Sequence, residues 1–78
     1  MSLPPIPPAE RARRLVALRP AIAHQARALA TLLAGVADLY RDWPGERDVI
    51  AYVGAYAEQV RHDLATLLVA ERKLTEAA

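Results

Sequence analysis

An apolar repeat in the first half of the chain constrains its fold most strongly. Apolar side chains recur at alternating intervals of three and four residues, at Leu15, Leu18, Ile22, Leu29, Leu32, Val36 and Leu39, and Gln25 is the polar member of the series. This spacing places all of them on one face of an α-helix. The repeat therefore predicts a long helix that packs against another helix, as in a bundle or a coiled coil.

A second helical pattern follows a short turn. Its apolar stripe consists of Val49, Val53, Tyr56, Val60, Leu64, Leu67 and Leu74, widened by Ile50, Ala57 and Leu68. Pro44 and Gly45 separate the two patterns, and the residue before a proline is disfavoured in a helix. We therefore expect a helix at about 8–42, a turn at 42–45 and a helix at about 46–75. Together they predict an all-α antiparallel helical hairpin.

Prolines punctuate the first helical pattern. Pro20 removes a backbone hydrogen bond and crowds the preceding turn. The repeat keeps its register across Pro20, so we expect a kink; a short separate helix at 9–18 is the alternative. Residues 1–7, MSLPPIP, are expected to form a proline-rich flexible arm, with a proline-recognition ligand as the alternative.

The length of the chain favours a partner. Its 78 residues form one small domain, and without cysteine no disulfide can stabilise it. Two helices cannot cover apolar faces this wide, which predicts a four-helix bundle completed by a homo- or heterodimer. A row of small residues, Ala21, Ala28 and Gly35, would let another helix approach closely. The predicted partner interface comprises Leu15, Leu18, Ile22, Leu29, Leu32, Val36, Val53, Tyr56, Val60, Leu64 and Leu67.

The turn carries a recognisable motif. Trp43-Pro44-Gly45 is followed by Glu46, and Tyr52 and Tyr56 lie nine and thirteen residues after the tryptophan. This pattern resembles the WXG family, the small ESAT-like helical hairpins of type VII secretion in bacteria. The resemblance implies a secretion substrate or partner that acts as a helical dimer.

Physically, Trp43 is expected to pack across the helix ends, and Gly45 to let the chain reverse closely. The family's Tyr-x-x-x-Asp/Glu secretion signal is missing, because Tyr52 and Tyr56 are followed four residues later by Tyr56 and Val60. A partner would then supply the signal, or the protein is not exported.

A cluster of arginines offers a different function. Arg11, Arg13 and Arg14, with Arg19 nearby, could contact phosphates, so a nucleic-acid-associated helical dimer is one alternative. However, the net charge is only +1, Glu10 interrupts the cluster, and no aromatic stacking platform accompanies it. We therefore favour a solvated helix surface and do not expect nucleic acid as the main partner.

Catalytic and metal chemistry find little support in the sequence. No nucleophile–base set, glycine-rich phosphate loop or paired-carboxylate cleft is readable, so no enzyme activity, cofactor or small-molecule substrate is predicted. Glu58, His62 and Asp63 could share a metal, and His24 could approach His62 across the hairpin, but no second pair supports a metal site. Asp63 could also form a buried polar pair with Gln25, or either residue could lie at the periphery.

The sequence thus predicts a non-enzymatic protein-interaction module. A small adaptor or inhibitor that docks on a larger complex, as phages and plasmids encode, is the alternative within this class. Neither a signal peptide nor an apolar run of transmembrane length is visible. We expect a cytoplasmic protein, or one exported without a cleaved signal peptide, and no membrane partner.

Overall fold

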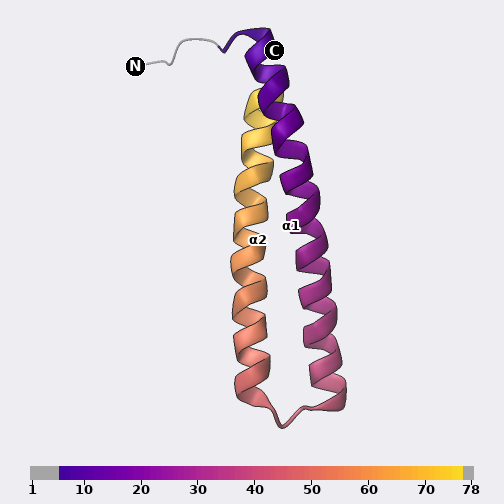
Figure 1. Ribbon diagram of the computed structural model, residues 1–78. Coiled ribbons are helices and arrows are strands. Elements are labelled where there is room, and N and C mark those ends of the chain that lie inside the picture. The colour runs from indigo at the N-terminus through magenta and orange to yellow at the C-terminus, as the bar shows by residue number, and fades with distance from the viewer. Residues whose placement is uncertain (1–5, 77–78) are drawn as a thin grey trace, which may run out of the picture.

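Two long helices form an antiparallel hairpin in the computed structural model, which describes residues 6–76 (Figure 1). Helix α1 spans Pro8–Asp42 and helix α2 spans Arg47–Glu76. The predicted all-α antiparallel hairpin is therefore confirmed. The molecule measures 54 × 26 × 13 Å, so it is a slab one helix thick with two broad faces. Completion of a four-helix bundle by a second chain stays a prediction.

The start of α1 follows from its local sequence. Pro8 occupies the first helical turn, where its missing N–H costs no hydrogen bond, and Glu10 lies in the same turn near the positive end of the helix dipole. The preceding Pro7 has φ −58° and ψ 145°, which is polyproline geometry. The rest of the predicted arm, residues 1–5, lies outside the described residues.

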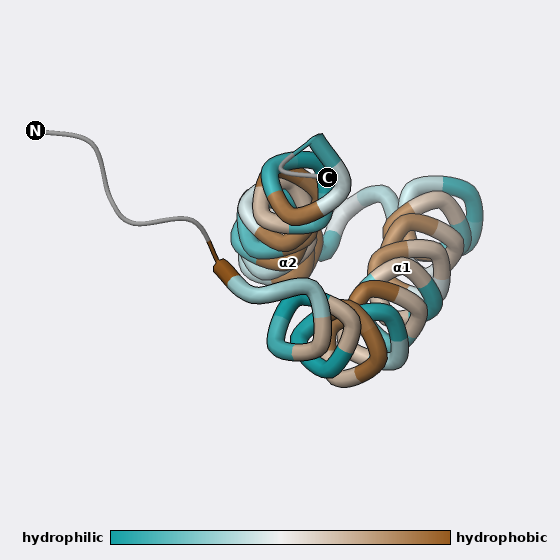
Figure 2. The backbone as a smooth tube through the Cα atoms, turned by 90° about the horizontal axis from the view of Figure 1, so that it is seen from above, coloured by the Kyte–Doolittle hydropathy of each residue, from teal (hydrophilic) through white to brown (hydrophobic). Residues whose placement is uncertain are grey.

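Helix α1 continues through Pro20 without interruption, so no separate helix forms at 9–18. Figure 2 shows its first turns displaced sideways from the rest of the helix, and the kink expected at Pro20 stays a prediction. Leu18 and Ile22, on either side of the proline, are both half-buried, while Pro20 itself is exposed. Packing on both sides thus holds the helix together where one backbone hydrogen bond is lost.

The turn between the helices is closed by backbone hydrogen bonds. The N–H of Trp43 donates to the carbonyl of Leu39 at 2.8 Å, and the N–H of Glu46 donates to the carbonyl of Trp43 at 3.0 Å. Pro44 and Gly45 occupy the two central positions of this four-residue turn. No described residue has a positive φ, so the backbone does not demand glycine here, contrary to our expectation for Gly45.

The core of the hairpin is a thin line rather than an enclosed volume. Ile50, Ala57 and Val60 are the buried hydrophobic residues, and all three belong to α2. The apolar repeat of α1 faces α2 but is only half-buried, because a single neighbouring helix cannot cover it. The half-buried members of this repeat are Leu15, Leu18, Ile22, Leu29, Leu32, Val36 and Leu39.

The packing stripe of α2 agrees with the prediction at five positions and differs at two. The residues packed as predicted are Val53, Val60, Leu64, Leu67 and Leu74, which are buried or half-buried. Val49 and Tyr56, expected on the stripe, are 45% and 56% exposed, and Ile50 and Ala57, expected only at its edge, are buried instead. Apolar residues stand at both 49–50 and 56–57, so the sequence allowed either member of each pair on the stripe. The observed choice places the small side chain of Ala57 against α1.

Candidate functional site

The polar side chains of the hairpin are solvated rather than gathered into an enclosed site. Within residues 6–76 no polar or charged side chain is buried, and no group of three or more His, Cys, Asp or Glu residues could hold a metal ion. Asp63 is exposed and accepts a hydrogen bond from Gln59 at 3.1 Å, while Gln25 is half-buried. Asp63 therefore lies at the periphery, and the predicted alternative of a buried pair with Gln25 is wrong.

Neither helix is a candidate for crossing a membrane. In the part of the chain that the structure describes, no helix is both long enough and apolar enough to span a bilayer.

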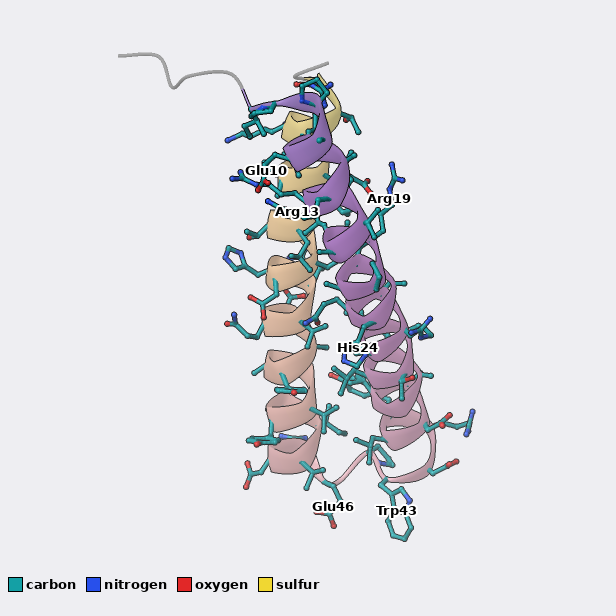
Figure 3. The ribbon with its side chains drawn as sticks, turned by 45° about the horizontal axis from the view of Figure 1, so that its top comes forward. Glu10, Arg13, Arg19, His24, Trp43 and Glu46 are labelled. Carbon is teal, nitrogen blue, oxygen red and sulfur yellow. The ribbon has the colours of Figure 1, made fainter. Side chains whose placement is uncertain are left out.

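The arginine cluster lies on the first turns of α1, where a carboxylate offsets part of its charge. Arg13 and Arg14 both form ion pairs with Glu10, the second at 3.0 Å, and Figure 3 shows Arg13 close to Glu10. Arg11 is half-buried. Farther along α1, Arg19 lies 3.7 Å from Glu71 of α2, which links the two helices at their open end. The predicted phosphate contacts Arg11, Arg13 and Arg14 thus share a surface that is partly neutralised by Glu10.

Other arginines are paired within their own helix. Arg41 donates hydrogen bonds to Asp42 at 3.0 Å and Asp38 at 2.9 Å, and Arg61 donates to Glu58 at 2.7 Å. The pKa of Arg41 is raised, mainly by its hydrogen bond to Asp42 and next by the negative charge of Asp38. The pKa of Arg61 is raised by its hydrogen bond to Glu58. Arginine is positive at physiological pH in any case, so these shifts report pairing and not a titration.

Two uncharged segments lie side by side near the turn. Residues 28–37 of α1 and 49–57 of α2 contain no charged side chain, and the hairpin brings the two segments partly alongside each other, with Val36 and Gly54 lining the same groove. A helix that is apolar on every side is normally covered on every side. Here large apolar side chains remain exposed, and we call them the turn-half apolar belt. Its members and exposed fractions are Leu33 (54%), Tyr40 (63%), Val49 (45%), Tyr52 (75%) and Tyr56 (56%).

An open groove of about 400 Å³ lies within this half of the hairpin. It is lined by Val36, Tyr40, Pro44, Arg47, Ile50, Ala51 and Gly54. The two helices separate toward the turn in Figure 1, which leaves this space between them. A Cβ added at Gly54 or at Gly35 would meet no heavy atom within 4 Å. Gly35, expected to permit close helix packing, is half-buried, but no atom of α2 comes within 4 Å of the position that its Cβ would take.

Trp43 does not pack across the helix ends. Its side chain is 63% exposed, and Figure 3 shows the indole projecting from the turn away from both helices. The expectation that it fixes the turn by packing is wrong, because backbone hydrogen bonds close the turn and the diverging helix ends offer no layer to cover. The indole is instead available to another molecule.

Sequence reasoning missed part of this surface. It placed Tyr56 in a packing stripe and did not single out Leu33 or Tyr40. The signal that identifies Leu33 is the absence of charge from 28–37 and 49–57, which extends around each helix and not only along its inner face. Tyr40 lies outside these segments, between Asp38 and Arg41, and this signal does not mark it.

Comparisons with known proteins identify no relative. No protein-family model matches the chain, and no curated protein or solved structure matches it.

Proposed function

We propose that this protein is a non-enzymatic protein-interaction module that completes its hydrophobic core with another protein chain. The turn-half apolar belt is the observation that carries this proposal. Three hydrophobic residues are buried in the hairpin, whereas large apolar side chains are exposed around it. A surface of this kind on a thin slab is typical of a protein-binding site.

The free energy available from this belt is substantial. Burying apolar surface contributes about 25 cal/mol per Å², and an aromatic side chain buries on the order of 200 Å² when fully covered. Covering the exposed half of one tyrosine would thus contribute about 2 kcal/mol. Tyr40, Tyr52 and Tyr56 are all more than half exposed, so a partner could gain several such contributions.

The resemblance of the turn to WXG proteins suggests a specific role within this proposal. The protein would act as a small WXG-type secretion substrate or partner, in a helical dimer. The hairpin form and the sequence Trp43-Pro44-Gly45 at its turn support this role. An adaptor or inhibitor that docks on a larger complex would use the same belt and is the second reading.

Solution mass by light scattering, measured across a dilution series with helicity followed by circular dichroism, tests the proposal. We expect a mass greater than one chain, with helicity falling as dilution separates the chains. A weakly helical monomer would also support it, since the missing partner would then be a different chain. A fully helical, cooperatively unfolding monomer at every concentration would overturn it.

A further inference from the structure

Helix α1 carries a second apolar repeat about 100° around the helix from the face that meets α2. Its members are Ala23, Ala26, Ala30, Leu33, Ala37 and Tyr40, spaced alternately by three and four residues, and all six are exposed. We call this row the outer seam. It has the spacing of a helix-packing face, and its two large members are more than half exposed. The hairpin leaves it without a neighbour.

The outer seam and one side of α2 share a broad face of the slab. Tyr40 lines the groove together with Ala51 and Gly54, so these residues open onto the same face. Three–four spacing continues this side of α2 through Glu58, Arg61 and Ala65. Tyr52 lies two positions before Gly54 and Tyr56 two positions after it, each about 200° around the helix, so both face away from this side.

The sizes of the outer-seam residues are self-complementary in an antiparallel alignment. Laying the seam against a copy of itself in reverse pairs Tyr40 with Ala23, Leu33 with Ala30, and Ala37 with Ala26. Each large side chain meets a small one, as close packing requires. A parallel alignment would place Tyr40 against Tyr40 and leave alanine against alanine. Antiparallel pairing of this kind is an isologous contact with two-fold symmetry.

Charge on α2 fits the same arrangement. The ion pair between Arg19 and Glu71 fixes which residues of the two helices lie side by side. With the same rise along both helices, the centre of the outer seam lies beside about residues 58–59 of α2. A two-fold axis there brings Glu58 and Arg61 of one copy close to the partner's Arg61 and the partner's Glu58. Opposite charges therefore meet where Glu58 and Arg61 interrupt an otherwise uncharged stretch of this face.

The area is sufficient for a stable dimer. The alignment superposes residues 21–42 of α1, which span about 33 Å at 1.5 Å per residue. The slab is 26 Å wide, so the shared face covers on the order of 800 Å² per chain, the size of a standard interface. We propose that a second copy of this chain docks here, α1 antiparallel to α1 and α2 antiparallel to α2. This inference rests on the proposed function and names a partner for the face of the belt that carries Leu33 and Tyr40.

Disulfide cross-linking tests this register directly, because the described residues contain no cysteine. The double variant Ala26→Cys/Ala37→Cys should form a covalent dimer under mild oxidation, since residue 26 of each copy faces residue 37 of the other. Within one helix these positions are about 16 Å apart, too far for a disulfide. Cysteine replaces alanine with a small change in volume, so the fold should persist, and circular dichroism checks it.

Three controls make the result specific. The single variants Ala26→Cys and Ala37→Cys should stay unlinked, as should Arg27→Cys/Asp38→Cys, which has the same spacing about 100° around the helix. Cross-linking of the single variants would show a parallel dimer and overturn the register. A dimer by light scattering in which Ala26→Cys/Ala37→Cys stays unlinked would overturn this face but not the proposed function. A fully helical monomer at every concentration would overturn both.

Discussion

The two ends of the hairpin differ in the charge and apolar character of their exposed surfaces. At the open end, Glu10 pairs with Arg13 and Arg14, and Arg19 meets Glu71 across the helices. At the turn end, the neighbouring segments 28–37 and 49–57 contain no charge, and large apolar side chains are exposed. The open end also exposes apolar side chains, Val16, Leu68 and Val69, but they alternate with these charged residues. We propose that the turn end, where charge is absent, is the part that another protein surface covers.

The largest expected effect comes from a charge between the helices. Leu29→Asp should abolish folding or assembly, because a carboxylate would replace a half-buried apolar residue of the α1 repeat. Urea unfolding followed by circular dichroism should show a loss of at least about 3 kcal/mol, in line with large losses at core leucines. Thr31→Asp is the control, since Thr31 is exposed two positions away. A Leu29→Asp protein as stable and as associated as the parent would contradict the assigned packing face.

A matched pair of substitutions compares the two ends. Leu33→Ser should weaken association at least about tenfold, or about 1.4 kcal/mol, because it removes a large side chain from the turn-half apolar belt. Val16→Ser is the control at the open end, where Val16 is 71% exposed, and should leave association unchanged. The dissociation constant from sedimentation or light scattering measures both. Equal increases in the dissociation constant for the two variants would contradict the proposed difference between the ends.

Gly54 provides a test of the open groove. Gly54→Ala should stabilise the isolated hairpin by about 1 kcal/mol, because alanine favours the helix interior and an added Cβ meets no atom within 4 Å. Thermal unfolding at low concentration measures this gain. Weaker association of the same variant would show that a partner side chain fills the groove, whereas destabilisation of the dilute protein would mean that the space is occupied within the chain.

Trp43 should contribute little to the stability of the hairpin. Trp43→Ala is expected to lower the free energy of unfolding by less than about 1 kcal/mol, because the indole is mostly exposed and backbone hydrogen bonds close the turn. Chemical denaturation of the dilute protein checks this. A loss of about 3–5 kcal/mol, typical of a buried tryptophan, would show instead that Trp43 packs against the helices at the turn.

The smallest effect is expected at the open end. Arg19→Gln removes an exposed ion pair with Glu71 and should cost less than about 1 kcal/mol, with the difference fading as salt screens the charges. Chemical unfolding at low and high salt measures this loss of stability.

Varying the salt concentration also tests a nucleic-acid role. Binding of a DNA or RNA duplex through Arg11, Arg13 and Arg14 should fall steeply as salt rises, whereas association through apolar surfaces should persist.

The sequence predicts the hairpin well because both helices obey strong local rules. The repeat from Leu15 to Leu39 defines which face of α1 meets α2, and Pro44 separates the helices. The stripe of α2 was wrong at Val49 and Tyr56, because adjacent apolar residues at 49–50 and 56–57 are equally consistent with the spacing. The position of Trp43 was also wrong, since whether a turn residue is covered depends on how the helix ends diverge, which no local pattern records.

Hydrogen exchange of backbone amides, measured above and below the concentration at which the chains associate, tests the central claim most directly. Covering of the turn half predicts that amides of residues 28–37 and 49–57 gain protection on association, while those of the first turns of α1 and the last turns of α2 change little. Equal protection along both helices at all concentrations would contradict the claim that the turn end is the part that another chain completes.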